Sequence, residues 1–277
     1  MTTTNERILM CPPDYYTVEY AINPWMGGQE GAVDHNLAKQ QWTMLRDKLG
    51  EFADITLVAP ESGLPDMVFT ANAGAVYENK AIASHFWHLE RRPEEQHFKR
   101  WFRGNGFELL ELDDKIGFEG AGDCLIDRAG PWAWVGHGFR TEIEAHQTIE
   151  EYFDLEVVSL QLTDERFYHI DTCFCPLTDG FLIYHPPAFD YESRMAIESR
   201  VPPHKRIVVD TPDASRFACN AVNIDDQVFL HEASDPLKAQ LVLAGFEVHE
   251  VNLSEFLKAG GSARCLTLKL TESAVVR

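Results

Sequence analysis

The chain has 277 residues, of which 45% are hydrophobic and 25% are charged, a composition typical of a folded protein with a sizeable core. Its 24 Lys and Arg residues face 44 Asp and Glu residues, which gives a net charge of −20. This negative charge argues against nucleic acid or an anionic membrane as the main partner and allows a small cationic substrate. No apolar run approaches the length of a membrane span.

The six cysteines are scattered and form no CxxC pair; they stand at 11, 124, 173, 175, 219 and 265. The chain also shows no basic segment followed by a long apolar stretch, as a secretory signal would require. Both observations favour reduced thiols over a disulfide framework and predict a cytoplasmic protein.

In chain order, a first strand at "ILMCPPDYY" is followed by a helix near "NLAKQQWTMLRDKL" and a strand at "DITLVAP". Four further units each open with a short strand that begins in a cluster of small and polar residues. These openings, at Phe69, Phe118, His169 and Ala218, are 49, 51 and 49 residues apart. Each unit continues with a second strand after a turn, a helix such as "PEEQHFKRWFRGNG" and a closing strand such as "FELLEL". A period near fifty indicates a repeat architecture.

Five units of strand, strand, helix, strand predict an α/β fold that closes into a ring. No linker rich in Gly, Ser or Pro divides the chain, so we expect one domain over residues 1–277. The alternative is a general α/β domain in which the spacing is coincidental.

In such a ring the unit openings converge at the centre, and they carry polar side chains. These are Asp66, Asn72, Glu119, Asp123, His169, Asp171, Asn220 and Asn223. Cys265, in "GGSARCLTLKL", occupies the equivalent place where the last unit closes the ring. The repeat therefore predicts that Cys265 and His169 meet, as a nucleophile and a group that transfers protons do. The alternative for any single cysteine is a small buried core residue.

Two other motifs do not support a ligand site. In "HIDTCFC", alternate residues from His169 to Cys175 would point to one face of a strand. Four ligands along one extended strand cannot surround a tetrahedral ion, so we expect no metal. The "GGQEG" segment at Gly27–Gly31 lacks the lysine of a phosphate loop, and we interpret it as a mobile loop over the ring centre.

With these residues in view, the chain resembles the guanidino-group-modifying superfamily of arginine deiminases, dimethylarginine hydrolases, amidinotransferases and arginine dihydrolases. Five motifs in the same order carry the resemblance over essentially the whole chain: "LPDMVFTANAGAV", "FEGAGDCLI", "GHGFRT", "YHIDTCFCPL" and "GGSARCLTLKL". The segment "MCPPDYYTVEYAINPWM" looks most like the arginine dihydrolase branch, which converts arginine to ornithine, ammonia and carbon dioxide. The resemblance implies a five-bladed α/β propeller (a pentein) and no metal or organic cofactor.

The resemblance also implies a role for each matching residue. Cys265 matches the nucleophile, His169 the general acid and base, and Glu119 and Asp171 the carboxylates that bind the guanidinium group. The implied substrate-binding residues are Asn23, Asn72, Arg91 and Arg140, with the two arginines binding the substrate carboxylate. Arg92 is an alternative to Arg91.

One departure concerns Asn72, where deiminases and dimethylarginine hydrolases carry an aspartate. A neutral amide offers both a donor and an acceptor, so it could hold a neutral ureido group as well as a guanidinium. We therefore hypothesise that Asn72 permits two hydrolyses at one site. The alternative is that Asn72 only supports the backbone of the site.

Other functions stay open at this level. A dimethylarginine dimethylaminohydrolase or an arginine deiminase would release citrulline, and an amidinotransferase would pass the amidino group to an amine. A ribosome-associated initiation factor, built from similar repeats, would bind without catalysis. The number of subunits is not determined by the sequence, and a homo-oligomer is one of the alternatives.

Overall fold

The computed structural model describes residues 6–271, and its strands form five small sheets of three strands each. The first sheet contains β1 (Arg7–Met10), β2 (Asp54–Leu57) and β15 (Leu268–Lys269), and the second contains β3 (Gly74–Tyr77), β4 (Lys80–Ala83) and β5 (Glu108–Leu110). The third contains β6 (Cys124–Ile126), β7 (Trp132–His137) and β8 (Glu156–Gln161). The fourth contains β9 (Phe174–Pro176), β10 (Leu182–Tyr184) and β11 (Arg206–Val208), and the fifth contains β12 (Val222–Ile224), β13 (Gln227–Leu230) and β14 (Glu247–Glu250).

Every sheet has the same pairing. Its middle strand runs antiparallel to the first strand and parallel to the third, as in β3–β4–β5, where Ala75 pairs with Ile82 and Ile82 with Leu110. The parallel pair needs a crossover, which in the second to fifth sheets contains α2 (Glu95–Gly104), α3 (Ala145–Phe153), α4 (Tyr191–Arg200) and α6 (Asp235–Leu243). The predicted α/β class and the order strand, strand, helix, strand are confirmed.

The first unit takes its inner strand from the other end of the chain. Strand β15 pairs antiparallel with β1, β1 pairs parallel with β2, and α1 (His35–Leu49) lies between β1 and β2 in sequence. The main-chain N–H of Leu270 also donates to the carbonyl of Arg7 at 2.8 Å. The strand that follows the "GGSARC" turn is therefore fixed by the opening segment of the chain.

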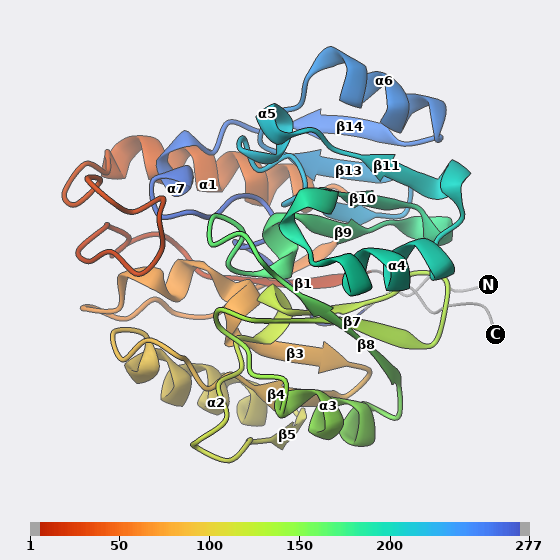
Figure 1. Ribbon diagram of the computed structural model, residues 1–277. Helices are drawn as coiled ribbons and strands as arrows, with labels where there is room; N and C mark the ends of the chain where they lie inside the picture. Colours follow the sequence, from red (N-terminus) through yellow and green to blue (C-terminus); the bar gives the residue numbers. More distant parts are fainter. Residues whose placement is uncertain (1–5, 272–277) are drawn as a thin grey trace.

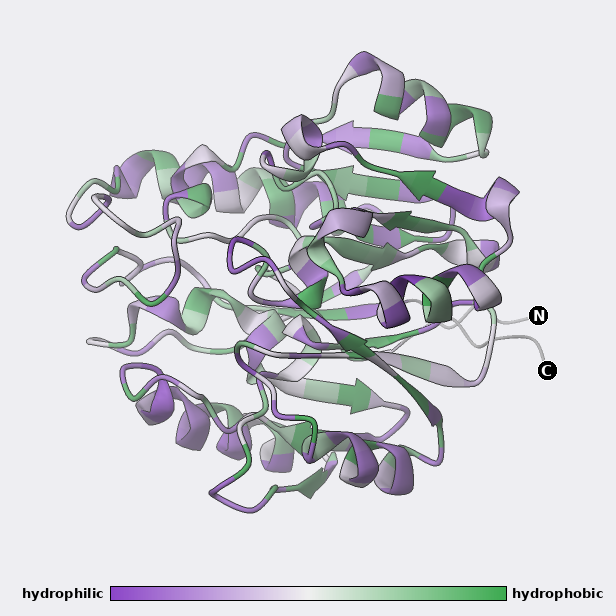
Figure 2. Cartoon of the chain, viewed as in Figure 1, coloured by the Kyte–Doolittle hydropathy of each residue, from purple (hydrophilic) through white to green (hydrophobic). Residues whose placement is uncertain are grey.

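The helices lie on the outside and the strands within. Helices α2 and α3 are at one edge of the molecule in Figure 1 and α6 is at the opposite edge, with the strands between them. Helix α1 begins at an Asp34 cap, whose carboxylate accepts from two main-chain N–H groups, and it buries Trp42 and Leu45 against the core. Figure 2 shows the resulting pattern of hydrophobic strands and helices with mixed faces. Two shorter helices, α5 (Thr211–Ala214) and α7 (Ser254–Leu257), complete the set.

The unit openings differ from the sequence prediction. They are short 3₁₀ turns rather than strand starts, at η2 (Thr70–Ala73), η4 (Gly120–Gly122) and η5 (Ile170–Thr172), and the inner strands begin only at residues 74, 124 and 174. The prediction that His169 to Cys175 alternate along one strand is therefore wrong. The turn hydrogen bonds, such as Cys173 N–H to Ile170 O at 3.0 Å, curl this backbone before β9 starts.

Within residues 6–271, no helix combines the length and the apolar character needed to cross a membrane.

Gly120 is a position where the fold requires glycine. Its φ is +62°, and a Cβ there would lie 2.8 Å from main-chain atoms of Gly74. We expect Gly120→Ala to lower the free energy of unfolding by about 2 kcal/mol or more, because backbone cannot move away as a side chain can. The matched control is Gly104→Ala in α2, where a Cβ meets nothing within 4 Å; it should be neutral or stabilise slightly. Urea unfolding of both variants tests this, and equal stabilities would contradict it.

Candidate active site

Cys265 lies in the tight turn between α7 and β15, and only 3% of it is exposed. Its main chain is held on both sides: the carbonyl accepts from Ala71 N–H at 3.1 Å, and the N–H donates to the Asn220 side-chain oxygen at 3.2 Å. These bonds come from two different units. The position of the thiol is therefore fixed by the neighbouring openings and not by its own strand.

The sulfur of Cys265 has two polar neighbours. The Asn220 amide donates to Sγ at 3.1 Å, and Sγ donates to Asp171 Oδ2 at 3.4 Å. Burial, followed by the charge of Asp171, raises the pKa of the Cys265 thiol well above its ordinary value. Burial also raises the pKa of the Asp171 carboxyl to about 7, against the opposing effect of Arg264. The resting site thus holds a protonated thiol beside a carboxyl that titrates near neutrality.

His169 and Glu119 form a second buried pair. His169 Nε2 lies 2.8 Å from Glu119 Oε2, and the other carboxylate oxygen accepts from Trp87 N–H at 3.1 Å. Burial would raise the pKa of Glu119, but three interactions outweigh it and hold this pKa well below its usual range. They are the charge of Arg140, whose Nη1 lies 3.3 Å from Oε2, the hydrogen bond with His169 and the charge of Arg91. Because Glu119 is ionised, it accepts from Nε2–H, which leaves Nδ1 of His169 for proton transfer.

A cavity with about 280 Å³ of empty space lies over the thiol. It is lined by Ile22, Asn23, Met26, Asp66, Phe69, Asn72, Arg91, Arg140, Tyr168, Ala259 and Cys265. The lining combines a thiol, a carboxyl and two guanidinium groups. Such a set suits a small molecule that carries a cationic group at one end and a carboxylate at the other.

The two arginines of the cavity differ in how many donors they have left. Arg91 donates to Glu94 through Nε and Nη2, at 3.0 and 2.8 Å, and also to Asn72 Oδ1 at 2.8 Å and to the Asp66 carbonyl at 3.1 Å. One of its five N–H groups remains. Arg140 donates to Glu119 and to the Ile22 carbonyl, which leaves three.

The choice between Arg91 and Arg92 follows from the same geometry. Arg91 lines the cavity, whereas Arg92 is absent from its lining and donates through Nε to the carbonyl of Phe86 at 3.0 Å. Arg91 is therefore the arginine of this pair that can reach a bound molecule.

Asn72 uses both ends of its amide. Its oxygen accepts from Arg91, and its Nδ2 donates to the main-chain carbonyl of Glu119 at 3.3 Å. A Cβ added to Gly122 would lie 2.5 Å from this Nδ2 and 3.0 Å from His169 Nδ1. Gly122 thus permits the side chains of two units to approach each other.

The segment around Asn23 covers the cavity. Asn23 donates to the carbonyl of Ala259 at 3.0 Å, and the Trp25 indole donates to the carbonyl of Arg166 at 2.7 Å. Gly260, at φ +81°, permits this contact, because a Cβ there would lie 2.9 Å from the Asn23 oxygen. Ile22, Asn23 and Met26 therefore line the cavity, whereas no residue of Gly27–Gly31, the segment expected to cover the ring centre, is among its lining residues.

The structure gives contacts in the site to three residues that the sequence analysis did not assign a role, of which it named Asp66 and Asn220 only as polar residues of the unit openings. The Asn220 amide donates to the thiol, and Asp66 lines the cavity. The Tyr168 ring packs against the Arg140 guanidinium, with 4.6 Å between the ring centroid and Cζ. Burial raises the pKa of Asp66 in spite of Arg91 and a 2.9 Å bond from Tyr20. Asp66 and Asn220 share the repeat position of the predicted residues, so the repeat itself was the signal.

Among residues 6–271, no group of three or more His, Cys, Asp or Glu could hold a metal ion.

The structure thus contains a buried thiol beside Asp171, a buried His169–Glu119 pair and a cavity lined by Cys265 and Asp66, although His169, Glu119 and Asp171 are not among the lining residues. The sequence matches the family described as "N,N dimethylarginine dimethylhydrolase, eukaryotic" over residues 30–272. The chain belongs to this family, and the predicted membership of the superfamily is confirmed.

Known relatives extend the comparison. The chain is 54% identical to the bifunctional arginine dihydrolase/ornithine cyclodeaminase ArgZ of Synechocystis over 96% of its own length, but it spans only 38% of that protein. It is 40% identical to the N(G),N(G)-dimethylarginine dimethylaminohydrolase of Mycobacterium tuberculosis. That match covers 97% of this chain and 87% of that protein.

The structure is also similar to a crystal structure of the N-terminal domain of ArgZ, in a Cys→Ser variant bound to substrate. The TM-score is 0.96 at 54% identity, and the match covers 96% of this chain and 98% of that domain.

The contact between Asp171 and the thiol makes a testable prediction. Asp171→Asn removes the charge that helps to raise the Cys265 pKa, so more thiolate should be present at pH 8. Each unit by which this pKa falls should raise the thiolate fraction about tenfold, and alkylation by neutral iodoacetamide should become faster by a smaller factor, because nucleophilicity falls with the pKa. Asp190→Asn, at the cap of α4, is the matched control and should leave the rate unchanged. A slower reaction in Asp171→Asn would mean instead that Asp171 takes up the thiol proton.

Proposed function

We propose that the chain is an arginine dihydrolase, which hydrolyses the guanidino group of L-arginine to ornithine, ammonia and carbon dioxide. The observation that carries this proposal is the single cavity that joins the Cys265 thiol to Asp66, Arg91 and Arg140. The similarity to the arginine dihydrolase domain of ArgZ supports it.

Substrate binding follows from the donors and acceptors of the cavity. Arg140, with three N–H groups left, binds the α-carboxylate in a bidentate manner, and Arg91 adds one further donor. Glu119 and Asp171 face the guanidinium group, and Asn23 and Asn72 contact the substrate. The cationic group stabilises the ionised form of Asp171 and offsets the burial that raises its pKa to about 7.

Catalysis then proceeds through a covalent intermediate. The Cys265 thiol passes its proton to Nδ1 of His169, and its sulfur forms a bond to the guanidinium carbon. The bond from this carbon to one terminal nitrogen then breaks as His169 gives that proton to the departing ammonia. A water deprotonated by His169 attacks the thiouronium carbon, which breaks the bond to sulfur and leaves citrulline. Glu119 holds the imidazole in one orientation through both steps.

A second round acts on the ureido group of citrulline. Cys265 attacks the ureido carbon and a second ammonia leaves. Hydrolysis releases a carbamic acid, which breaks down to carbon dioxide and ornithine. The neutral Asn72 amide, which already donates to one group and accepts from another, suits this neutral substrate.

A second candidate function is favoured by the family match. A dimethylarginine dimethylaminohydrolase would use the same thiol and release dimethylamine and citrulline. A deiminase would stop at citrulline, and an amidinotransferase would need an amine in place of water.

The wider organisation is part of the same proposal. The five sheets with identical pairing, joined through β1 and β15, support a closed five-bladed α/β propeller and one domain over residues 1–277. The six cysteines are all free, which supports a reducing compartment such as the cytoplasm. A homo-oligomer is compatible with this organisation.

The deciding measurement is a count of products from L-arginine. We expect ornithine and about two molecules of ammonia per arginine, as two rounds of attack require. Citrulline with one ammonia would identify a deiminase, and turnover of dimethylarginine alone would identify the second candidate. Cys265→Ser should abolish both turnover and labelling by a haloacetamidine.

Asn72→Asp tests the basis of the second round. An aspartate would place a carboxylate oxygen against the Glu119 carbonyl, where Asn72 now donates at 3.3 Å, and would favour a cationic substrate over a neutral one. We expect citrulline to accumulate and its own hydrolysis to fall by about tenfold or more. The substitution leaves the Glu119 side chain in place, and Glu119 holds His169 for the first hydrolysis, so the first ammonia should still be released. Complete conversion to ornithine by this variant would show that the hypothesis is wrong.

A further inference from the structure

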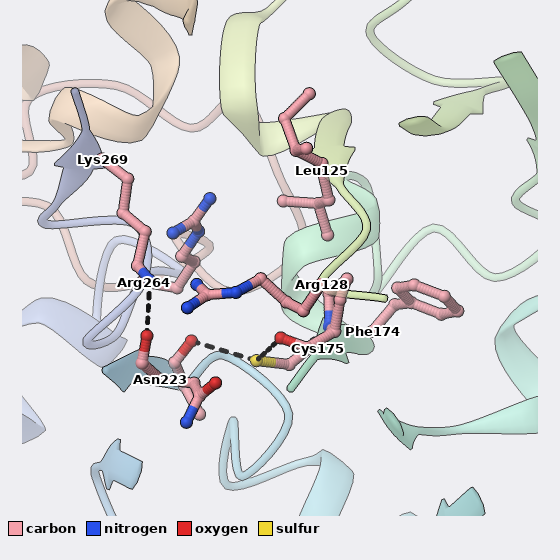
Figure 3. Close-up of a pocket in the computed structure, with 10 residues that line it drawn as sticks. Leu125, Arg128, Phe174, Cys175, Asn223, Arg264 and Lys269 are labelled. Atoms are coloured by element: carbon pink, nitrogen blue, oxygen red, sulfur yellow. Dashed lines mark hydrogen bonds between the residues drawn. The ribbon is translucent and has the colours of Figure 1, made fainter. Parts of the chain in front are cut away.

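A second cavity lies on the other side of the turn that carries the nucleophile. It is a small cavity, with about 310 Å³ of space when the part open to solvent is counted, and it shares no lining residue with the cavity over Cys265. Its walls come from the inner strands β6, β9, β12 and β15 or the residues beside them, and Arg264, which directly precedes Cys265, contributes a wall. Figure 3 shows the side chains of Arg128, Arg264 and Lys269 beside one another in this cavity.

The charge of this cavity is opposite to that of the chain. The described lining residues include three cations, Arg128, Arg264 and Lys269, and no carboxyl group. The whole chain has 44 acidic and 24 basic residues, so such a concentration of positive charge is unusual here. Glu6 lies beside the cavity and pairs with Arg128 at 2.9 Å and with Lys269 at 2.7 Å.

Arg264 differs from the other two cations. Its main chain is bonded to Asn220, but its guanidinium makes no hydrogen bond or ion pair with any residue from 6 to 271, although the side chain is partly buried. The guanidinium keeps all five of its donors for a ligand or water in the cavity, because its nitrogens are not enclosed by the protein. This group faces the cavity, which identifies where the acceptor would lie.

We propose that this cavity binds a small oxyanion of the size of bicarbonate or phosphate, with Arg264 as its main ligand. The planar guanidinium of Arg264 can bind two oxygens of the anion in a bidentate manner. Arg128 and Lys269 add positive charge to the walls of the cavity. The ligand is separate from the substrate, because the arginine carboxylate is assigned to Arg140 and Arg91 in the other cavity. The proposal therefore does not depend on which guanidino reaction the enzyme performs.

The test is calorimetric titration of the full chain with inorganic phosphate and, in a second arm, with bicarbonate, at constant pH and ionic strength set with sodium chloride. We expect saturable binding of at least one of the two anions at one site. Arg264→Gln should weaken it about tenfold or more, because a charge-assisted contact is lost. Arg264→Lys keeps the charge but lacks the planar guanidinium, so it should bind the anion with intermediate affinity. Such intermediate binding would show that the weaker binding of Arg264→Gln is not caused by misfolding.

Two controls distinguish this site from others. Arg46→Gln, on the exposed face of α1, changes the net charge equally and should leave binding unchanged. Arg140→Gln removes the main carboxylate ligand of the substrate cavity and should also leave it unchanged. The proposal is overturned if neither anion binds the unmodified chain, if Arg264→Gln binds as the unmodified chain does, or if binding is lost in Arg140→Gln instead.

Discussion

The structure depends on buried polar side chains at the unit openings that bond to the main chain of the neighbouring unit. Asn72 donates to the carbonyl of Glu119, Asp123 accepts from Ile170 N–H at 3.0 Å, and Asn220 donates to the carbonyl of Asp171 at 2.9 Å. The openings are irregular backbone, so they have no ladder partners, and buried main-chain groups without partners are costly. The side chains supply those partners and join each unit to the next.

The same bonds explain why Cys265 and Asp171 lie beside each other. Each opening turn precedes its inner strand, and polar side chains of the neighbouring unit fix its position. Cys265 is held by Asn220, which also holds the carbonyl of Asp171. One amide therefore positions both the nucleophile and the carboxyl beside it. Asn220 therefore stabilises the fold and positions the thiol through the same side chain. The thiol is as buried as a core residue.

The sequence predicted the position of the site better than its local backbone. A period near fifty is enough to align Glu119, His169 and Cys265, because it records which residues share a place in the repeat. It does not record that Gly120 adopts a positive φ or that residues 170–172 curl, since those depend on contacts between units. The choice between Arg91 and Arg92 was open for the same reason: both stand in one segment, and only the packing separates them.

The carboxyl groups of the site differ in their pKa values. Arg140, the hydrogen bond with His169 and Arg91 outweigh burial and keep Glu119 ionised, whereas burial raises the pKa of both Asp66 and Asp171. One carboxyl oxygen of each, Oδ1, has no hydrogen-bond partner among residues 6–271. Under the proposed function, the substrate guanidinium would bring a positive charge and several donors, which would offset the cost of ionising these groups and supply the missing bonds. The same cation would favour the thiolate of Cys265, so the proposal ties activation of the thiol to substrate binding.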